Sequence, residues 1–321
     1  MDERQSRLRA SADGGTGRRL AMARRLAFSL VAVAGLLATA PAHSQSLAQS
    51  PVQSPGIVAR PQGVDDARGS IELVDPKVLR VCADPSNLPF SNRAGDGFEN
   101  RLAELLAKKL GKDLAYSYYP GATGFIRNTL NAHLCDVVMG MPQGDDLVQP
   151  TNPYYRTSYA VVYRAGSDLE GLTSLADPRL AKDKRIGLVA NTPPGNLLAR
   201  YRLLAAVKSY PLVVDTRVDA PAADMIHDLE SGAIDVAILW GPIAGYHVKK
   251  SGGGLKEALL TGDKGARMSF RIAMGVRHSD QEWKRELNRL IAQNQNEIDR
   301  LLAEFGVPLI DEADAPITPA P

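Results

Sequence analysis

A similar arrangement of apolar and polar positions occurs twice along the chain. In each copy a helix-like stretch ends in a small polar turn, and a short apolar strand, a Gly and a Pro follow. The copies read LNAHLCDVVMGMP at residues 130–142 and LESGAIDVAILWGP at residues 229–242. They predict two α/β lobes. Because open α/β sheets bind ligands at the carboxyl ends of their strands, two facing lobes would enclose a shared cleft.

The first half of the chain alternates strand and helix patterns. We expect strands at residues 79–83, 114–119, 136–140 and 159–163. The first helix, which ends at Gly111, is marked by apolar residues at helical spacing, namely Phe98, Leu102, Leu105, Leu106 and Leu110. Thr123 is the expected cap of a further helix.

The second half repeats this order. Its expected strands are residues 185–189, 212–214 and 234–240, and its expected helices are residues 197–204 and 222–229. A strand at residues 268–276 would return the chain to the first lobe, before a long amphipathic helix at residues 281–305.

The predicted fold class is therefore α/β. Lobe 1 would comprise residues 71–164 and 268–312, and lobe 2 would comprise residues 165–267. The chain would cross between the lobes near residues 164–168 and 263–267, and these two crossings would form a hinge.

The two ends differ in composition from the lobes. Residues 1–44 carry arginines, an apolar run at 26–40 and then small residues, which is the pattern of an export signal peptide with either Sec or Tat export open. The run is too short for a membrane anchor, and no later stretch is long and apolar enough to span a bilayer. Residues 45–70 are expected to be a flexible leader and residues 313–321 a flexible tail.

Charge argues against nucleic acid as a partner. The formal net charge is +2, and residues 1–44 contribute seven arginines against three acidic residues, so the exported chain carries −2. A slightly acidic chain has no basic field to hold phosphate backbones.

The two cysteines, Cys82 and Cys135, both lie in the exported part. An oxidising compartment favours a disulfide between them. The alternative is two buried free thiols, because a bridge needs Cα atoms within about 7 Å and the residues lie late in one predicted strand and at the start of another.

Metal binding and catalysis have little support in the sequence. The five histidines are scattered without metal-ligand spacing, so neither a metal nor a cofactor is expected. Glu99 and His133 could act as acid or base, but no nucleophile–base pair or nucleophile elbow is present. We therefore predict no enzyme, with a periplasmic lyase as the second alternative to the function given below.

Four sequence segments resemble those of a known family. They are RVCADPSNLPFSN at residues 80–92, GFEN at 97–100, CDVVMGMP at 135–142 and PYYR at 153–156. The order of elements resembles the type II periplasmic solute-binding proteins over residues 78–310. Within that superfamily the strings are similar to the quinoprotein-dehydrogenase-associated proteins, the J proteins of methanol dehydrogenase clusters (MxaJ/XoxJ type).

The resemblance implies a two-lobe type II periplasmic binding protein fold with two hinge crossovers and a periplasmic location. It also implies a partner, a quinoprotein alcohol dehydrogenase that uses pyrroloquinoline quinone (PQQ), with or without its cytochrome c. The implied role is in the maturation or activation of that enzyme. A solute-binding receptor of an ABC transporter for a small non-amino-acid ligand is the alternative.

The chain departs from amino-acid binders at two charged positions. Such proteins place an Arg shortly after the Gly that ends the third strand, where this chain reads GMPQGDDL at residues 140–147. They place an Asp after the third strand of lobe 2, where this chain reads WGP at residues 240–242. Unpaired zwitterion charges in a closed cleft would cost several kcal/mol, so an apolar or aromatic ligand or a protein segment is favoured.

The expected cleft residues follow the strands of both lobes. They are Asp84, Asn87, Leu88, Phe90, Phe98, Glu99, Met141, Pro142 and Gln143 in lobe 1, and Asn191, Thr192, Pro193, Trp240 and Gly241 in lobe 2. Structural alternatives remain, since Asp84 and Asn87 are ordinary turn formers, Glu99 suits a helix start, and Trp240 could be a half-buried core ring.

Overall fold

The computed structural model describes residues 72–318. The expected signal peptide and leader, and residues 319–321, lie outside the described residues. Within the described part, none of the helices combines the length and the apolar character needed to cross a membrane.

The fold is organised around one mixed β-sheet. Its strands are β1 (Val78–Ala83), β4 (Asp113–Tyr118), β5 (Val137–Pro142), β6 (Gln149–Arg164), β7 (Ile186–Val189), β8 (Val207–Tyr210), β9 (Val236–Trp240), β10 (Leu255–Leu259) and β11 (Ser269–Val276). The order is β4-β1-β5-β11-β6-β9-β7-β8, with β10 also paired to β6. The near-continuous apolar runs of β5 and β9 suit buried strands with parallel neighbours.

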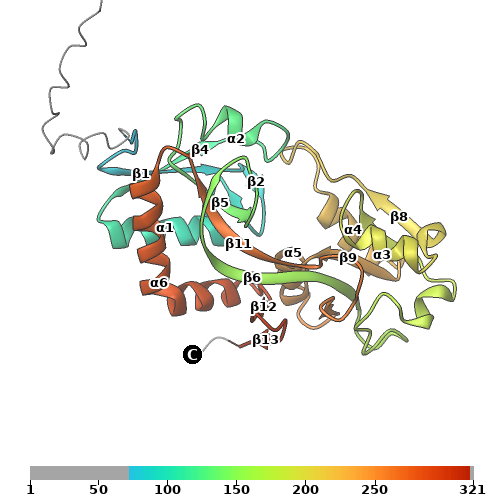
Figure 1. The fold of residues 1–321 in the computed structure, drawn as a ribbon. Helices are drawn as coiled ribbons and strands as arrows, with labels where there is room; N and C mark the ends of the chain where they lie inside the picture. The colour runs from blue at the N-terminus through green and yellow to red at the C-terminus, as the bar shows by residue number, and fades with distance from the viewer. Residues whose placement is uncertain (1–71, 319–321) are drawn as a thin grey trace, which may run out of the picture. The chain divides into compact units, whose positions relative to one another are not determined.

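Two antiparallel strands connect two parallel groups. β1, β4 and β5 are parallel to one another, and so are β7, β8 and β9. β6 and β11 run side by side between these groups (Figure 1) and pair antiparallel from Ser269 opposite Ser158 to Val276 opposite Gln149. The expected return strand at residues 268–276 is therefore confirmed.

Helices and short strands complete the described chain. The helices are α1 (Phe98–Leu110), α2 (Phe125–Asn128), α3 (Pro194–Arg200), α4 (Pro221–Glu230), α5 (Gly241–Lys250) and α6 (Gln281–Glu304), with 3-10 turns η2 (Pro178–Ala181) and η3 (Leu204–Ala206). The short strands are β2 (Ser86–Asn87), β3 (Ser91–Asn92), β12 (Leu309–Ile310) and β13 (Pro316–Ile317). Gly111 caps the C-terminal end of α1, and its φ of 64° is a conformation that glycine adopts without a Cβ penalty.

The buried apolar residues form separate cores for the two lobes. Leu79, Val137 and Ile272 belong to the main core of lobe 1, and residues 160–163 pack with lobe 2. The chain therefore passes from one core to the other inside β6, close to Ser158. The crossing lies earlier than the expected residues 164–168, because Val161 and Tyr163 are already buried in the lobe 2 core.

Several sequence-based boundaries are wrong. The strand expected at 212–214 is replaced by β8, which stops before Pro211 because proline lacks the N–H that a ladder needs. The residue before α2 is Gly124 rather than Thr123. α3 ends at Arg200, short of residue 204.

The expected flexible tail is ordered as far as it is described. Pro316–Ile317 forms β13 and pairs with β12, and the N–H of Asp311 donates to the carbonyl of Ala315. The Asp314 carboxylate pairs with Arg156 at 2.6 Å. Contacts with distant residues hold a segment whose own composition predicts fraying.

Cys82 and Cys135 form a disulfide, with a Cα–Cα distance of 5.4 Å. The parallel pairing of β1 with β5 brings the two cysteines together, so their different positions along the strands do not prevent the bridge. Beside them Asp136, which is 1% exposed, accepts from Arg80 at 2.6 Å and from Arg277 at 2.8 Å. This ionic cluster satisfies charges that would otherwise be buried unpaired.

Candidate ligand pocket between the lobes

A pocket of about 450 Å³ lies between the two lobes. Lobe 1 contributes Asn87, Leu88 and Asn92, from the loop that follows β1. Lobe 2 contributes residues from the 211–223 segment and from α5. The pocket thus lies where the carboxyl ends of strands β1 and β8 meet, the usual place for a ligand in open α/β sheets.

Asp84 forms hydrogen bonds with residues on both sides of this pocket. Its carboxylate is buried and accepts hydrogen bonds from the N–H of Ser86 at 2.8 Å and from the N–H of Gly121. It also accepts from the hydroxyl of Thr216, at 2.8 Å to one carboxylate oxygen and 2.9 Å to the other. Because Thr216 belongs to the lobe 2 segment, this contact connects the lobes. Asp84 therefore positions the pocket walls from within the protein.

The aromatic residues expected in the cleft pack in the core. Phe98 is fully buried and does not line this pocket. Phe90 lies against it with ring centroids 5.3 Å apart. The helical spacing of apolar residues in the sequence also indicated a core position for Phe98, and Phe98 lies in the core of lobe 1.

Glu99 is half-buried and has an altered acidity. Burial, and secondarily the charge of Asp84, raise its pKa to about 8. Gly140, beside Glu99, has a φ of +74°, a conformation that favours glycine, and a Cβ there would also lie 2.4 Å from Oε1 of Glu99. The carboxyl group therefore takes its proton near neutral pH, but Glu99 does not line the pocket.

The remaining lobe 1 residues lie at the end of β5. Pro142 pairs with Ile272 of β11, and the N–H of Gln143 donates to the carbonyl of Arg271 at 2.8 Å. Met141 is in the same paired strand. None of the three lines the pocket.

The lobe 2 residues are also separated from the pocket. Asn191, Thr192 and Pro193 line another hollow of lobe 2, of about 710 Å³. Trp240 packs against Tyr159 and Phe270, with ring centroids 5.1 Å and 5.7 Å apart.

Gly241 is buried at the start of α5, where a Cβ would meet the carbonyl oxygen of Ser158 at 2.5 Å. Of the residues expected in the cleft, the structure thus places Asn87 and Leu88 in the wall of this pocket.

The sequence reasoning missed exposed apolar residues of lobe 2 beside the pocket. Leu212 lines the pocket and is 51% exposed. Val213 and Val218 belong to the same segment without lining the pocket and are 60% and 78% exposed. Leu88 faces the pocket from lobe 1 and is 40% exposed. We refer to these four residues as the apolar rim. The sequence signal for this rim was the apolar run at residues 212–214. Pro211 directly before it argues against a strand there, because proline lacks the N–H that strand pairing needs.

The pocket also contains ionic groups away from the positions considered in the sequence. Asp219 and Lys250 line it, and both are exposed. His247 lines it too, and burial together with the charge of Lys250 lowers its pKa. No arginine is among the described residues that line it. Across residues 72–318, no three His, Cys, Asp or Glu side chains are grouped to hold a metal ion.

Comparison with known proteins identifies the family of this chain. The profile of the bacterial extracellular solute-binding proteins, family 3, matches residues 79–307. The chain belongs to this family. This family 3 protein is 30% identical over 250 residues to protein MoxJ of Methylorubrum extorquens, which covers 74% of this chain and 83% of MoxJ.

Two solved structures are similar over most of this family 3 chain. The periplasmic binding protein XoxJ from Methylobacterium extorquens AM1 is 40% identical, with a TM-score of 0.63 and coverage of 73% of this chain and 100% of that chain. MxaJ from Methlophaga aminisulfidivorans MPT is 27% identical, with a TM-score of 0.62 and coverage of 72% and 100%. These similarities confirm the expected resemblance and the two-lobe type II α/β fold.

Proposed function

We propose that this family 3 protein is a periplasmic accessory protein of a quinoprotein alcohol dehydrogenase such as methanol dehydrogenase. In this role it binds a segment of the dehydrogenase between its lobes and assists maturation or activation of the enzyme. PQQ would belong to the dehydrogenase, and the role of this chain would be non-catalytic.

The apolar rim is the observation that carries this proposal. Apolar side chains from both lobes are exposed around one pocket, and exposed apolar groups at a concave site favour a protein or ligand that covers them. The similarity to MoxJ, XoxJ and MxaJ supports the choice of partner. Glu99 and His133, the acid–base candidates, do not line the pocket, which favours binding over catalysis.

The test combines co-purification and enzyme activity. We expect the dehydrogenase to co-purify with this protein from periplasm, and its activity to fall in a deletion strain. Leu212→Asp should weaken the complex about fivefold or more, since a buried anchor of an interface is worth over 1 kcal/mol. Leu134→Asp is the matched control, because Leu134 is 56% exposed in lobe 1 and does not line the pocket.

The result that contradicts the proposal is unchanged dehydrogenase activity without any complex. Equal weakening by Leu212→Asp and Leu134→Asp would contradict the assignment to the apolar rim.

Asp219 and Lys250 support one alternative, a receptor that delivers a small ligand to an ABC transporter. Opposite charges at one pocket can orient a small polar molecule. This alternative predicts micromolar binding of a small molecule, a thermal shift on binding and loss of uptake on deletion.

A further inference from the structure

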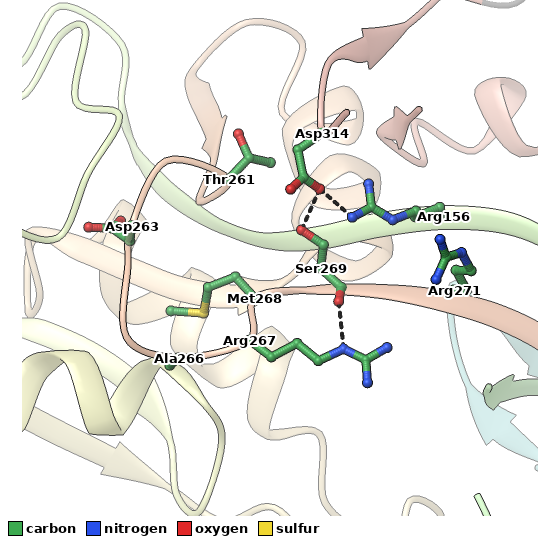
Figure 2. A pocket seen from close by; sticks show the side chains of 9 residues that line it. All are labelled: Arg156, Thr261, Asp263, Ala266, Arg267, Met268, Ser269, Arg271 and Asp314. Carbon is green, nitrogen blue, oxygen red and sulfur yellow. Dashed lines mark hydrogen bonds and ion pairs between the residues drawn. The ribbon is translucent and has the colours of Figure 1, made fainter. Parts of the chain in front are cut away.

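A second hollow, of about 460 Å³, lies along the strands that join the lobes. Three of its residues are arginines, Arg156 in β6, Arg271 in β11 and Arg267 just before β11 (Figure 2). Arg156 and Arg271 are direct partners in the antiparallel register. Like charges directly opposite one another destabilise a sheet, so a negatively charged group beside this pair would offset the repulsion.

The chain's own C-terminal segment supplies that negative charge. Arg156 pairs with Asp314 at 2.6 Å and donates a further hydrogen bond to the backbone carbonyl of Asp311. Nε of Arg271 donates to Glu312 at 3.0 Å. Figure 2 shows Arg156 and Ser269 both pointing at Asp314, and the Ser269 hydroxyl donates to it at 2.8 Å. The groups recognised are thus two carboxylates and a peptide carbonyl, which together describe an acidic peptide.

The hollow offers one more cation than this segment uses. Arg267 is exposed, and its Nε donates to the carbonyl of Ser269 at 3.1 Å. Its guanidinium lies over the ring of Phe270, 4.6 Å from the centroid. No carboxylate of residues 72–318 pairs with Arg267 in the described structure. Asp263, in the same hollow, is directed to lobe 2, where it accepts from Ser174 at 2.7 Å.

We infer that Arg156, Arg267 and Arg271 form a docking surface for an acidic peptide segment of a partner protein, which exchanges with residues 311–314. This surface is separate from the pocket between the lobes and does not rest on the proposed function. The covalently attached segment competes at a high effective concentration, so it lowers the apparent affinity for the partner. The ion pairs that must break are partly exposed and individually weak, so exchange is feasible.

The test uses the full chain and a fluorescein-labelled peptide of alternating Asp and Gly, followed by anisotropy at low salt. In Glu312→Gln/Asp314→Asn the competing carboxylates are gone, and the peptide should bind about 2- to 30-fold more tightly than to the wild type, the range expected for two exposed ion pairs. Glu282→Gln/Glu286→Gln on α6 is the matched control, since it removes the same charge from exposed pairs with Arg285 and Arg289. Adding Arg267→Gln to the first variant should weaken binding severalfold.

Three results would overturn the inference. The first is equal affinity of the two double variants for the peptide, and the second is equal binding of a peptide with Asn in place of Asp. The third is complete displacement by inorganic phosphate at matched charge, which would indicate a site for free anions. Because the double variant retains all three arginines and no dehydrogenase is used, these outcomes are independent of the proposed function.

Discussion

The hydroxyl of Thr216 is expected to hold the lobes together across the pocket. Thr216→Val removes the donor that contacts both carboxylate oxygens of Asp84, and keeps nearly the same side-chain size. A hydrogen bond to a charged group contributes about 1.5–3 kcal/mol. If this contact exists only when the lobes are closed, its loss shifts the balance between closed and open forms about 10- to 150-fold toward open.

Pulsed EPR can measure that shift. Spin labels attached by non-thiol chemistry at the exposed Ala94 of lobe 1 and Ala199 of lobe 2 leave the disulfide intact, and longer distances should become populated in Thr216→Val. Thr192→Val is the control, because the Thr192 hydroxyl donates to the carbonyl of Val189, at 2.6 Å within lobe 2. The reasoning is refuted if both variants have the distance distribution of the wild type.

Two further predictions concern buried carboxyl groups. Asp136→Asn should lower the free energy of unfolding in urea by about 3 kcal/mol, because the buried Arg277 loses one of its two carboxylate partners and keeps only Asp280, and Arg80 loses its carboxylate partner as well. Asp168→Asn, in a partly exposed pair with Lys184, should cost under about 1 kcal/mol. Equal losses would contradict this. The pKa of Glu99 is raised from 4.5 to about 8, so the folded state holds a proton that the unfolded state loses, and the free energy of unfolding should fall between these pH values. Glu99→Gln should therefore gain stability relative to the wild type as pH rises through this window, and parallel pH profiles in urea unfolding would count against it.

The elements predicted correctly are those whose own residues carry a strong local pattern. The apolar runs at β5 and β9 and the helical spacing in α1 and α6 each lie within one continuous segment. Hydrophobic periodicity is local, so it is visible without knowledge of the partners. The strings that indicated the family are equally local. The disulfide followed from the small number of cysteines, and the pairing of β1 with β5 supplied the geometry.

The walls of the pocket depend on contacts between distant residues, which the sequence does not show. The Asp84–Thr216 contact joins positions 132 residues apart, and no local pattern distinguishes this Asp from a turn former. The ordered C-terminal segment depends in the same way on Arg156 and Arg271.

By itself, the sequence determined the two-lobe α/β class, the order of most elements and the family, since these follow from short-range apolar spacing and continuous strings. Tertiary structure alone decided which side chains reach the pocket, where the chain changes lobes inside β6, and which carboxylates meet the arginines of β6 and β11. The physical reason is that strand pairing and lobe contact set the surroundings of each side chain, and those surroundings decide whether a polar group is paired, buried or exposed.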